Sequence, residues 1–451
     1  MSLFGGVVPI TGITFLMFSV FVVAAFGYLL GRITIKGVSL GTAGVFIVAL
    51  LFGALFSDTI SETIVQKTTE TTVVSEVSEA ELTQAESDAN VSYTVNDDGT
   101  YTKTVTIKTA DISTSALKIV ENLGLILFVA SVGFIAGPNF FKNLKKNFKS
   151  YILLGLIIIV SASLACVACY FAGKGAEDDP KEFVAMLVGI LSGALTSTPA
   201  FSAAKATVAS EYEAAVTVGH GIAYLFGVIG VVLFVQLIPK LTRANMEEER
   251  KKITVVDTGL AEKKEGSFKL DGFGFCAFAI AVIIGILVGA VKIPLSSKGL
   301  DGTTFSLTTT GGVLLTTLVF GHFGKIGNVS FTIEKRVLET FREFGLMLFL
   351  IGAGIAGGAK FVEYFKPVYF LYGVVMTLVP LIVGYLFAKF VLKLPMLNNL
   401  GSITGGMTST PALGTLINVA GTDDVASAYA ATYPVALIAV VLLSQAIILI
   451  L

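Results

Sequence analysis

Twelve apolar stretches dominate this sequence, and each approaches the roughly 20 residues that a membrane-spanning helix needs. They occupy residues 14–31, 37–56, 118–137, 150–172, 183–210, 213–239, 272–291, 305–323, 338–358, 367–391, 401–420 and 425–451. A polar segment after residue 239 divides them into six and six. Charged residues make up only 14% of the chain, whereas soluble domains carry about 25%. The sequence therefore predicts an all-α polytopic membrane protein in a lipid bilayer.

The charge balance excludes a nucleic-acid-binding protein as a class. The net charge is −1, so the chain has no basic field for a phosphate backbone. Cys166 and Cys169 have the spacing of a redox or metal pair, but both lie within an apolar stretch, and we favour two buried side chains. We expect no metal site and no cofactor.

The two sets of six stretches resemble each other. "ENLGLILFVASVGFIAGPNFF" from Glu121 aligns with "REFGLMLFLIGAGIAGGAKFV" from Arg342, with glycines and phenylalanines matching at a constant offset. "SLGTAGV" (39–45) corresponds to "SLTTTGG" (306–312), and TSTP occurs at both Thr196–Pro199 and Thr408–Pro411. Three motifs in the same order indicate an internal duplication.

Loop charges bear on whether the two copies are parallel or inverted. Basic residues concentrate in the short loops at 32–36 and 138–150, which places these loops in the cytoplasm. If the TSTP stretch enters and leaves on one side, each copy crosses the membrane five times, and the odd number inverts the second copy; a full crossing is the alternative. We favour two inverted repeats, each of five transmembrane helices plus one re-entrant broken-helix hairpin, in the inner (plasma) membrane. Both chain termini are then extracytoplasmic.

This topology gives the domain boundaries. Residues 1–56 and 117–240 form the first repeat, 57–116 an extracytoplasmic cap insertion, 241–271 a cytoplasmic helix-plus-coil linker, and 272–451 the second repeat. The cap is expected to be a small α+β unit whose first twenty residues or so are disordered. "SEAE" (Ser78–Glu81) is a capping box for a short helix, and "VSYTVNDDGTYTKTVTIKT" is typical of a β-hairpin.

The TSTP motif has the chemistry of an interrupted helix. Exposed backbone groups in mid-membrane cost several kcal/mol each unless protein or a hydrated cavity faces them. We expect Thr198 to be the N-cap of a half-helix and Pro199 its first residue. The N-terminus of a helix carries partial positive charge and free N–H groups, so two such ends facing each other would hold an anion.

The candidate substrate-binding residues come from both motifs and their surroundings. They are Gly193, Thr196, Ser197, Thr198, Pro199, Gly405, Gly406, Thr408, Ser409, Thr410, Pro411, Tyr433, Lys205 and His220. The alternative for the motif residues and Tyr433 is close helix packing. Lys205 is either functional or extends to the membrane surface, and for His220 we favour a structural hydrogen bond over a proton relay.

The chain resembles a known family. "GYLLGRITIKGVSLGTAGVFIVALLFG" (27–53), "GLILFVASVGFIAGPNFF", "GALTSTPAF", "GLMLFLIGAGIAGG" and "GGMTSTPALGTL" are similar to the aspartate:alanine exchanger family of bacterial secondary transporters. The resemblance implies exchange of small carboxylates or amino acids, such as aspartate, alanine or succinate, by an elevator-like motion of a homodimer. The partners are then a small anionic or zwitterionic substrate and the bilayer. Many members carry two regulatory domains between the halves, for which residues 241–271 leave no room.

Two other functions remain open at this stage. One is a sodium-coupled symporter of anions or amino acids, in which unwound carbonyl groups near the TSTP turns bind the cation. The other is an intramembrane enzyme or sensor, which we disfavour because the sequence contains no GxSxG motif and only two histidines.

Overall fold

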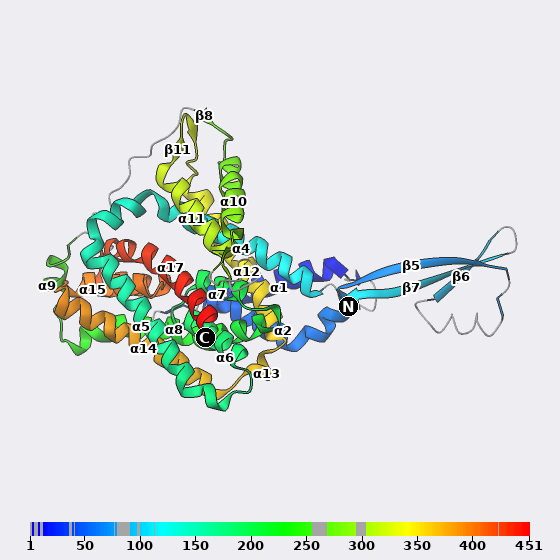
Figure 1. The fold of residues 1–451 in the computed structure, drawn as a ribbon, viewed down its shortest axis with the longest axis horizontal. Helices are drawn as coiled ribbons and strands as arrows, with labels where there is room; N and C mark the ends of the chain where they lie inside the picture. Colours follow the sequence, from blue (N-terminus) through cyan, green and yellow to red (C-terminus); the bar gives the residue numbers. More distant parts are fainter. Residues whose placement is uncertain are drawn as a thin grey trace.

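The computed structural model describes residues 2–3, 8–9, 12–35, 38–39, 41–75, 77–78, 91–96, 100–111, 113–254, 268–294, 304–422 and 424–451. Most of these residues are helical, and Figure 1 shows the helices gathered into one body with a thin arm of strands on one side. Within the described ranges, eight helices are long and apolar enough to cross a membrane. This confirms a multi-pass membrane protein that is mostly helical.

The helices of the first half follow the apolar stretches except at the predicted loop 138–150. They are α1 (Gly12–Gly31), α2 (Thr42–Thr63), α4 (Ser113–Asn147), α5 (Leu153–Gly173), α6 (Pro180–Ala194), α7 (Thr198–Thr207) and α8 (Glu213–Leu241). Residues 138–150 are not a loop: α4 continues through them to Asn147, and a π-helical turn follows. The stretch at 183–210 is thus two helices, α6 and α7, which we call the first hairpin. Its tip is the three-residue turn Leu195–Ser197 between them.

The second half repeats this order. Its helices are α10 (Phe275–Ala290), α11 (Thr308–Phe323), α12 (Lys335–Gly358), α14 (Pro367–Leu386), α15 (Met396–Gly406), α16 (Thr410–Ala420) and α17 (Val425–Ile450), with the short α13 (Phe361–Tyr364) before α14. We call α15 and α16 the second hairpin, and its tip is Met407–Ser409. At 1.5 Å per residue, α7 and α16 are each only about 15 Å long, half of a hydrocarbon core of roughly 30 Å.

Short strands and irregular turns connect several of these helices. The two-residue strands are β1 (Ser2–Leu3), β2 (Val8–Pro9), β3 (Thr34–Ile35), β4 (Val38–Ser39), β8 (Phe268–Lys269), β9 (Ile293–Pro294), β10 (Thr304–Phe305), β11 (Lys325–Ile326) and β12 (Val329–Ser330). A π-helical turn, Phe148–Ile152, joins α4 to α5, and a second one, Phe387–Val391, follows α14.

The two matching strings of the sequence pack directly against each other as α4 and α12. A Cβ atom at Gly124 would lie 2.4 Å from the backbone nitrogen of Phe349, and one at Gly345 would lie 2.5 Å from that of Phe128. Only glycine permits backbones to approach this closely. Since Gly352 lies against Glu121, while Gly345 lies against Phe128, the two helices run in opposite directions.

The helices form two groups. Helices α1, α2, α4, α10, α11 and α12 pack mainly against one another, and we call them the scaffold group. Helices α5 to α8 and α14 to α17 form the hairpin group, in which α6 packs on α8 and α15 packs on α17. Each hairpin also contacts a helix of the other half, α7 on α17 and α16 on α8. Both groups therefore combine elements from the two halves of the chain.

The arm that extends from the body in Figure 1 is a three-stranded antiparallel sheet between α2 and α4. Its strands are β5 (Val65–Val74), β6 (Val91–Val95) and β7 (Tyr101–Asp111), in the order β5-β7-β6. Pairing of Val95 with Tyr101 confirms the predicted hairpin strands, whereas the Asp-Gly turn and most of the predicted helix at Ser78–Glu81 fall outside the described residues.

The expected disorder at the start of this insertion is wrong. Helix α2 continues to Thr63, and β5 follows it directly and pairs with β7 along its whole length. The reason is composition: Val and Thr are β-branched and favour strands, and the long β7 provides the partner that an isolated strand lacks.

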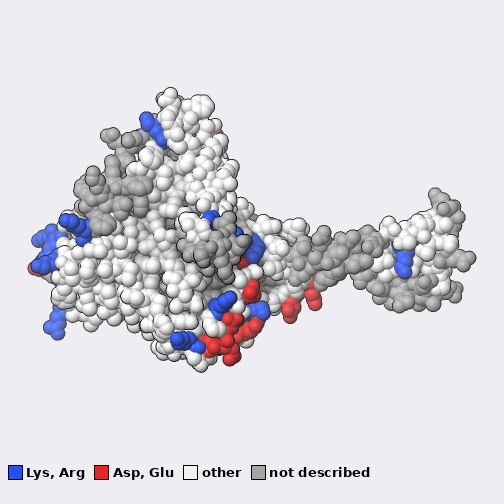
Figure 2. Space-filling view, viewed as in Figure 1, with Lys and Arg blue, Asp and Glu red and all other residues white. Residues whose placement is uncertain are grey.

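Charged side chains are sparse on the face of the body that Figure 2 shows. Figure 2 shows a largely uncharged surface, with basic side chains near α9 and acidic ones near α13. Helix α9 (Met246–Lys251) is the described helix of the predicted linker. The linker is attached to the second hairpin, because the Arg250 side chain donates to the carbonyl of Ala420, and Asn398 bonds both backbone groups of Thr254 at 3.0 and 2.7 Å.

The N-cap of the first hairpin is a carboxylate that makes a pH-dependent contribution to the stability of the fold. The Asp179 carboxylate accepts hydrogen bonds from the Tyr212 hydroxyl at 2.9 Å and from the backbone nitrogen of Lys181. The Tyr212 hydrogen bond is the main cause of a lowered pKa of Asp179. A carboxyl whose pKa is lower when folded stabilises the protein above its unfolded pKa, near 3.9, and loses that contribution as pH falls through the folded pKa.

We therefore expect Asp179→Asn to lower the melting temperature more at pH 7 than at pH 3, where the carboxyl of the unfolded chain is already mostly protonated. Thermal unfolding of the purified protein at both pH values measures this difference. Asp178→Asn removes the neighbouring carboxylate, which does not cap the helix, and is the matched control. Equal shifts for Asp179→Asn at both pH values would contradict the assigned role.

Candidate functional site

The two hairpin tips meet and bond to each other reciprocally. The Thr196 hydroxyl donates to the carbonyl of Met407 at 3.2 Å, and the Thr408 hydroxyl donates to the carbonyl of Leu195 at 2.8 Å. These threonines are the first residues of the two TSTP motifs. Their hydroxyl groups therefore hold the tips together and satisfy carbonyl groups that the helix ends leave without partners.

Both tips contain the same unusual backbone conformation. Thr196 has a φ angle of 54° and Thr408 one of 51°. For a β-branched residue the left-handed region is unfavourable by about 1–3 kcal/mol, and such residues cluster at functional sites. This turn also shifts the helix starts by one residue from the prediction: Ser197 and Ser409 are the N-caps, and Thr198 is the first helical residue, not the N-cap. The left-handed threonine completes the turn, so the serine after it is already extended.

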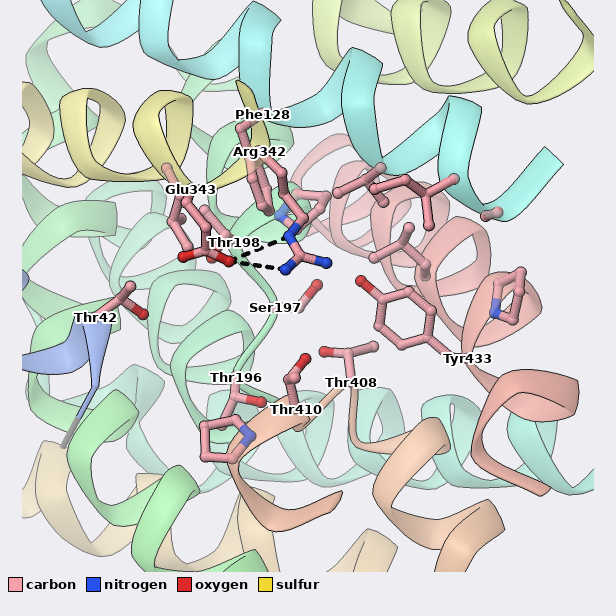
Figure 3. A pocket seen from close by; sticks show the side chains of 18 of the residues that line it. Thr42, Phe128, Thr196, Ser197, Thr198, Arg342, Glu343, Thr408, Thr410 and Tyr433 are labelled. Atoms are coloured by element: carbon pink, nitrogen blue, oxygen red, sulfur yellow. Dashed lines mark hydrogen bonds and ion pairs between the residues drawn. The ribbon is translucent and has the colours of Figure 1, made fainter. Parts of the chain in front are cut away.

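A cavity of about 490 Å³ lies where the tips face the scaffold group (Figure 3). Thirteen of its lining residues come from the hairpin group, namely Thr196, Ser197, Thr198, Pro199, Tyr224, Thr408, Thr410, Pro411, Tyr429, Ala430, Tyr433, Pro434 and Leu437. The scaffold group, together with Gly41 just before α2, contributes the other nine: Gly41, Thr42, Phe128, Val132, Ile135, Ala136, Arg342, Glu343 and Leu346. The cavity is thus an interface between the two helix groups.

Eight of the fourteen predicted residues line this cavity: Thr196, Ser197, Thr198, Pro199, Thr408, Thr410, Pro411 and Tyr433. The glycines have packing roles instead. A Cβ atom at Gly193 would lie 2.4 Å from the carbonyl of His220, one at Gly405 would lie 2.7 Å from that of Tyr429, and Gly406 is packed against Ile158. Ser409 is fully buried at the second tip.

Lys205 and His220 lie away from the cavity lining. The Lys205 ammonium group pairs with the Glu121 carboxylate at 2.6 Å, and both side chains are buried. The His220 Nδ1 atom lies 2.9 Å from the Ser192 hydroxyl, and its ring stacks on Phe201 with centroids 4.2 Å apart. This position agrees with the favoured structural hydrogen bond, which fixes α8 against the first hairpin.

Arg342 and Glu343 are the charged cavity residues that the sequence analysis did not select. They follow one another on α12, and their side chains form an ion pair at 2.8 Å. Figure 3 shows the Arg342 guanidinium directed into the space where the hydroxyls of Ser197, Thr408 and Tyr433 also lie. A signal was available, since Arg342 begins the repeated string at the position that Glu121 holds in the first copy.

Helix α17 adds two aromatic side chains to the cavity wall. Tyr429 and Tyr433 stack with ring centroids 5.1 Å apart, and the Tyr429 hydroxyl lies 3.2 Å from that of Thr410. Tyr429 and Thr410, the first residue of α16, therefore form one polar surface of the cavity. A guanidinium, several hydroxyls and the N-termini of α7 and α16 are groups that bind a carboxylate. The Glu343 carboxylate competes for the same guanidinium.

Comparison with known proteins gives a consistent result. A family model described as the predicted permease membrane region of the Asp-Al_Ex family matches residues 19–82, 99–240 and 277–449. An uncharacterized transporter of Bacteroides thetaiotaomicron is 25% identical, with 95% of this chain and 97% of that protein aligned. An uncharacterized transporter of Desulfotalea psychrophila is 22% identical over 73% of this chain and 88% of its own length. A putative transport protein of Edwardsiella ictaluri is 30% identical over 35% of this chain and 29% of its own length.

The interruption of the family match at residues 241–276 includes the whole of the predicted linker, 241–271. The alignment with the Bacteroides thetaiotaomicron protein runs over 588 positions, more than the 451 residues of this chain, so that relative contains segments that this chain lacks. The match covers most of both apolar halves and confirms the resemblance drawn from the repeated motifs. The chain is a multi-pass membrane transporter and belongs to the aspartate–alanine exchanger family.

Proposed function

We propose that this transporter exchanges small carboxylates or amino acids across the inner membrane, with the substrate bound between the two hairpin tips and Arg342. The observation that carries the proposal is the cavity itself. Two TSTP tips, each with a left-handed threonine, meet beside a guanidinium in a space of about 490 Å³, a volume within the range of small-molecule sites. Arg342 binds a carboxylate of the substrate, and the tip hydroxyls bind its remaining polar groups.

The packing of the repeats supports an inverted arrangement. The strings that begin at Glu121 and Arg342 are equivalent in sequence, and they cross in opposite directions as α4 and α12. Each half has five longer helices beside its hairpin, in line with the predicted crossing number, although α10 and α11 have 16 residues each and are shorter than the eight candidate spans. In this arrangement the two hairpins enter from opposite faces and meet at the midplane, as in other transporters built from broken helices.

Division into two helix groups supports an elevator-type mechanism of alternating access. The substrate-binding tips belong to the hairpin group, whereas Arg342 belongs to the scaffold group. Movement of the hairpin group along the scaffold would carry the tips and the substrate across the membrane together. We infer a homodimer from the family resemblance, and sedimentation equilibrium of the purified protein tests that inference.

The predicted topology also assigns a side to the open cavity. Gly41 and Thr42 lie at the start of α2, and Arg342 lies near the start of α12, ends that the loop charges place in the cytoplasm. The structure then corresponds to an inward-facing state, with both termini extracytoplasmic.

The direct test is counterflow in liposomes that contain the purified protein and a preloaded amino acid or dicarboxylate. We expect Thr198→Ala and Thr410→Ala each to weaken exchange about fivefold, because each removes one hydrogen bond to the substrate, worth about 1 kcal/mol. Thr207→Ala is the control away from the cavity, since the Thr207 hydroxyl lies at the far end of α7, where it donates to the carbonyl of Ala203 and accepts from the Gln445 side chain. Full exchange in the Thr198→Ala/Thr410→Ala double variant would argue against these hydroxyl roles.

The same assay separates exchange from sodium-coupled uptake. Exchange by the proposed mechanism continues when potassium replaces sodium on both sides of the membrane. The carbonyls of Leu195 and Met407 accept the reciprocal threonine hydrogen bonds, so these two unwound groups already have donors. Strict dependence on sodium would favour the symporter.

A further inference from the structure

A buried ion pair joins the two helix groups away from the cavity. Glu121 on α4, in the scaffold group, contacts Lys205 on α7, in the hairpin group, at 2.6 Å. The two side chains are only 9% and 8% exposed. Removing two charges from water costs several kcal/mol per ion, so a buried pair is a poor source of net stability and is best attested as a switch or a determinant of register. This pair must break if α7 moves along α4.

The repeat relates this ion pair to the open cavity. The alignment of "ENLG" with "REFG" places Glu121 and Arg342 at equivalent positions. Arg342 lines the cavity beside the second hairpin, whereas Glu121 is buried against the first hairpin. Equivalent residues of the two copies therefore occupy opposite environments, one open and one closed.

The hairpins show the same difference. Every residue of α7 from Thr198 to Lys205 is buried, whereas Thr410, Pro411 and Gly414 on α16 are exposed. The offset between the two TSTP motifs makes Gly414 the position in the second repeat that is equivalent to Ser202 in the first. The Ser202 hydroxyl lies 2.5 Å from that of Thr310 on α11, but a Cβ atom at Gly414 would meet nothing within 4 Å. The first hairpin is closed onto the scaffold group where the second hairpin leaves an opening.

We propose that the Glu121–Lys205 ion pair is a gate that closes the transport pathway on the side opposite the cavity. This gate proposal rests on the proposed function, because a second opening has meaning only for a protein that alternates access. In the other state of the cycle, the first hairpin separates from α4 and α11, and the second hairpin closes on α2 and α12. Glu121 and Lys205 then face the new opening and supply one anion and one cation, as Glu343 and Arg342 do here.

The chemistry of the pair suits a gate. While water is excluded, the two charges attract strongly and hold α7 against α4; once water enters, both are hydrated and the attraction falls several-fold. Opening thus exchanges a buried contact for hydration, and the two states remain close in free energy. An apolar contact at the same place would have to expose its surface to water on opening.

Two equivalent reporters test the gate without a transport assay. Ser202→Cys reports the closed side and Gly414→Cys the open side, each in a Cys276→Ser background, because Cys276 is exposed while Cys166 and Cys169 are buried. In purified full-length protein, we expect a charged thiol reagent to label Gly414→Cys quickly and Ser202→Cys slowly. The Glu121→Gln/Lys205→Met variant should raise the labelling rate at Ser202→Cys about tenfold and lower that at Gly414→Cys.

An exposed ion pair on the same two helix groups provides the control. Lys118 on α4 pairs with Glu213 on α8 at 2.8 Å, with 47% and 21% of the side chains exposed. Such pairs contribute little, so Lys118→Met/Glu213→Gln should leave both labelling rates unchanged. The reversed pair Glu121→Lys/Lys205→Glu, which keeps the charges, should restore slow labelling of Ser202→Cys.

Two results would overturn the gate. One is an unchanged Ser202→Cys rate in a folded Glu121→Gln/Lys205→Met protein, and the other is an equal rise in the Lys118→Met/Glu213→Gln control. If the double neutral variant does not fold, slow labelling must still return with the reversed pair, and rapid labelling of that variant also contradicts the gate. Failure of the exchange assay with an intact labelling pattern would count against the substrate and not against the gate.

Discussion

Replacing Arg342 by glutamine is expected to lower the exchange rate about a hundredfold at substrate concentrations below KM. The guanidinium is the cavity-lining cation in the described part of the chain, and hydrogen bonds to charged groups are worth about 1.5–3 kcal/mol. Arg342→Lys should recover only part of the loss, because lysine retains the charge but not the planar fork that matches a carboxylate. Counterflow into liposomes, normalised to the amount of folded protein, measures the effect.

A variant of Glu343 is the control for this prediction, and it also tests whether the substrate is a dicarboxylate or an amino acid. The Glu343 carboxylate pairs with Arg342 at 2.8 Å. Glu343→Gln removes a competitor for the guanidinium and should lower KM for a dicarboxylate, which has no ammonium group to pair with Glu343. For an amino acid the same change should raise KM, because the ammonium group loses an anionic partner. Unchanged exchange of every substrate in Arg342→Gln would exclude the assigned role.

The parts of the site that could be predicted from the sequence are those encoded locally. Thr196 and Thr408 stand in motifs of helix-interrupting residues inside apolar stretches, so two broken helices follow from composition and spacing alone. The tip-to-tip hydrogen bonds could not be predicted, since they join residues 211 and 213 positions apart and depend on how the hairpins pack.

Arg342 was missed for a physical reason. It lies near the polar start of an apolar stretch, where a charged residue is ordinarily solvated at a membrane surface, and only the three-dimensional position of α12 beside the tips gives it a site. Lys205 shows the opposite case: the sequence marked it as unusual, but its partner Glu121 lies 84 positions away on another helix. The N-cap of the half-helix is Ser197 and not the predicted Thr198, because the left-handed turn at Thr196 was not visible in the motif.

The crossing of α4 and α12 gives the second large expected effect, on folding. Gly124→Val and Gly345→Val should each prevent recovery of folded protein, because the added Cβ atoms would lie 2.4 and 2.5 Å from backbone nitrogens on the opposite helix. Backbone atoms cannot rotate away as the end of a side chain can, so the helices must separate. Overpacking in a dense interior typically costs about 1–3 kcal/mol and more where the backbone is displaced.

Gly414→Ala is the matched control, since its Cβ atom would meet nothing within 4 Å and alanine favours the helix. The measurement is the fraction of monodisperse protein in size-exclusion chromatography, followed by the melting temperature of any protein recovered. The two valine variants should have equal effects, because each glycine lies against the equivalent helix of the other repeat. A large loss for Gly124→Val with normal recovery of Gly345→Val would show that the two helices do not cross at these residues, and would remove the packing support for inverted repeats.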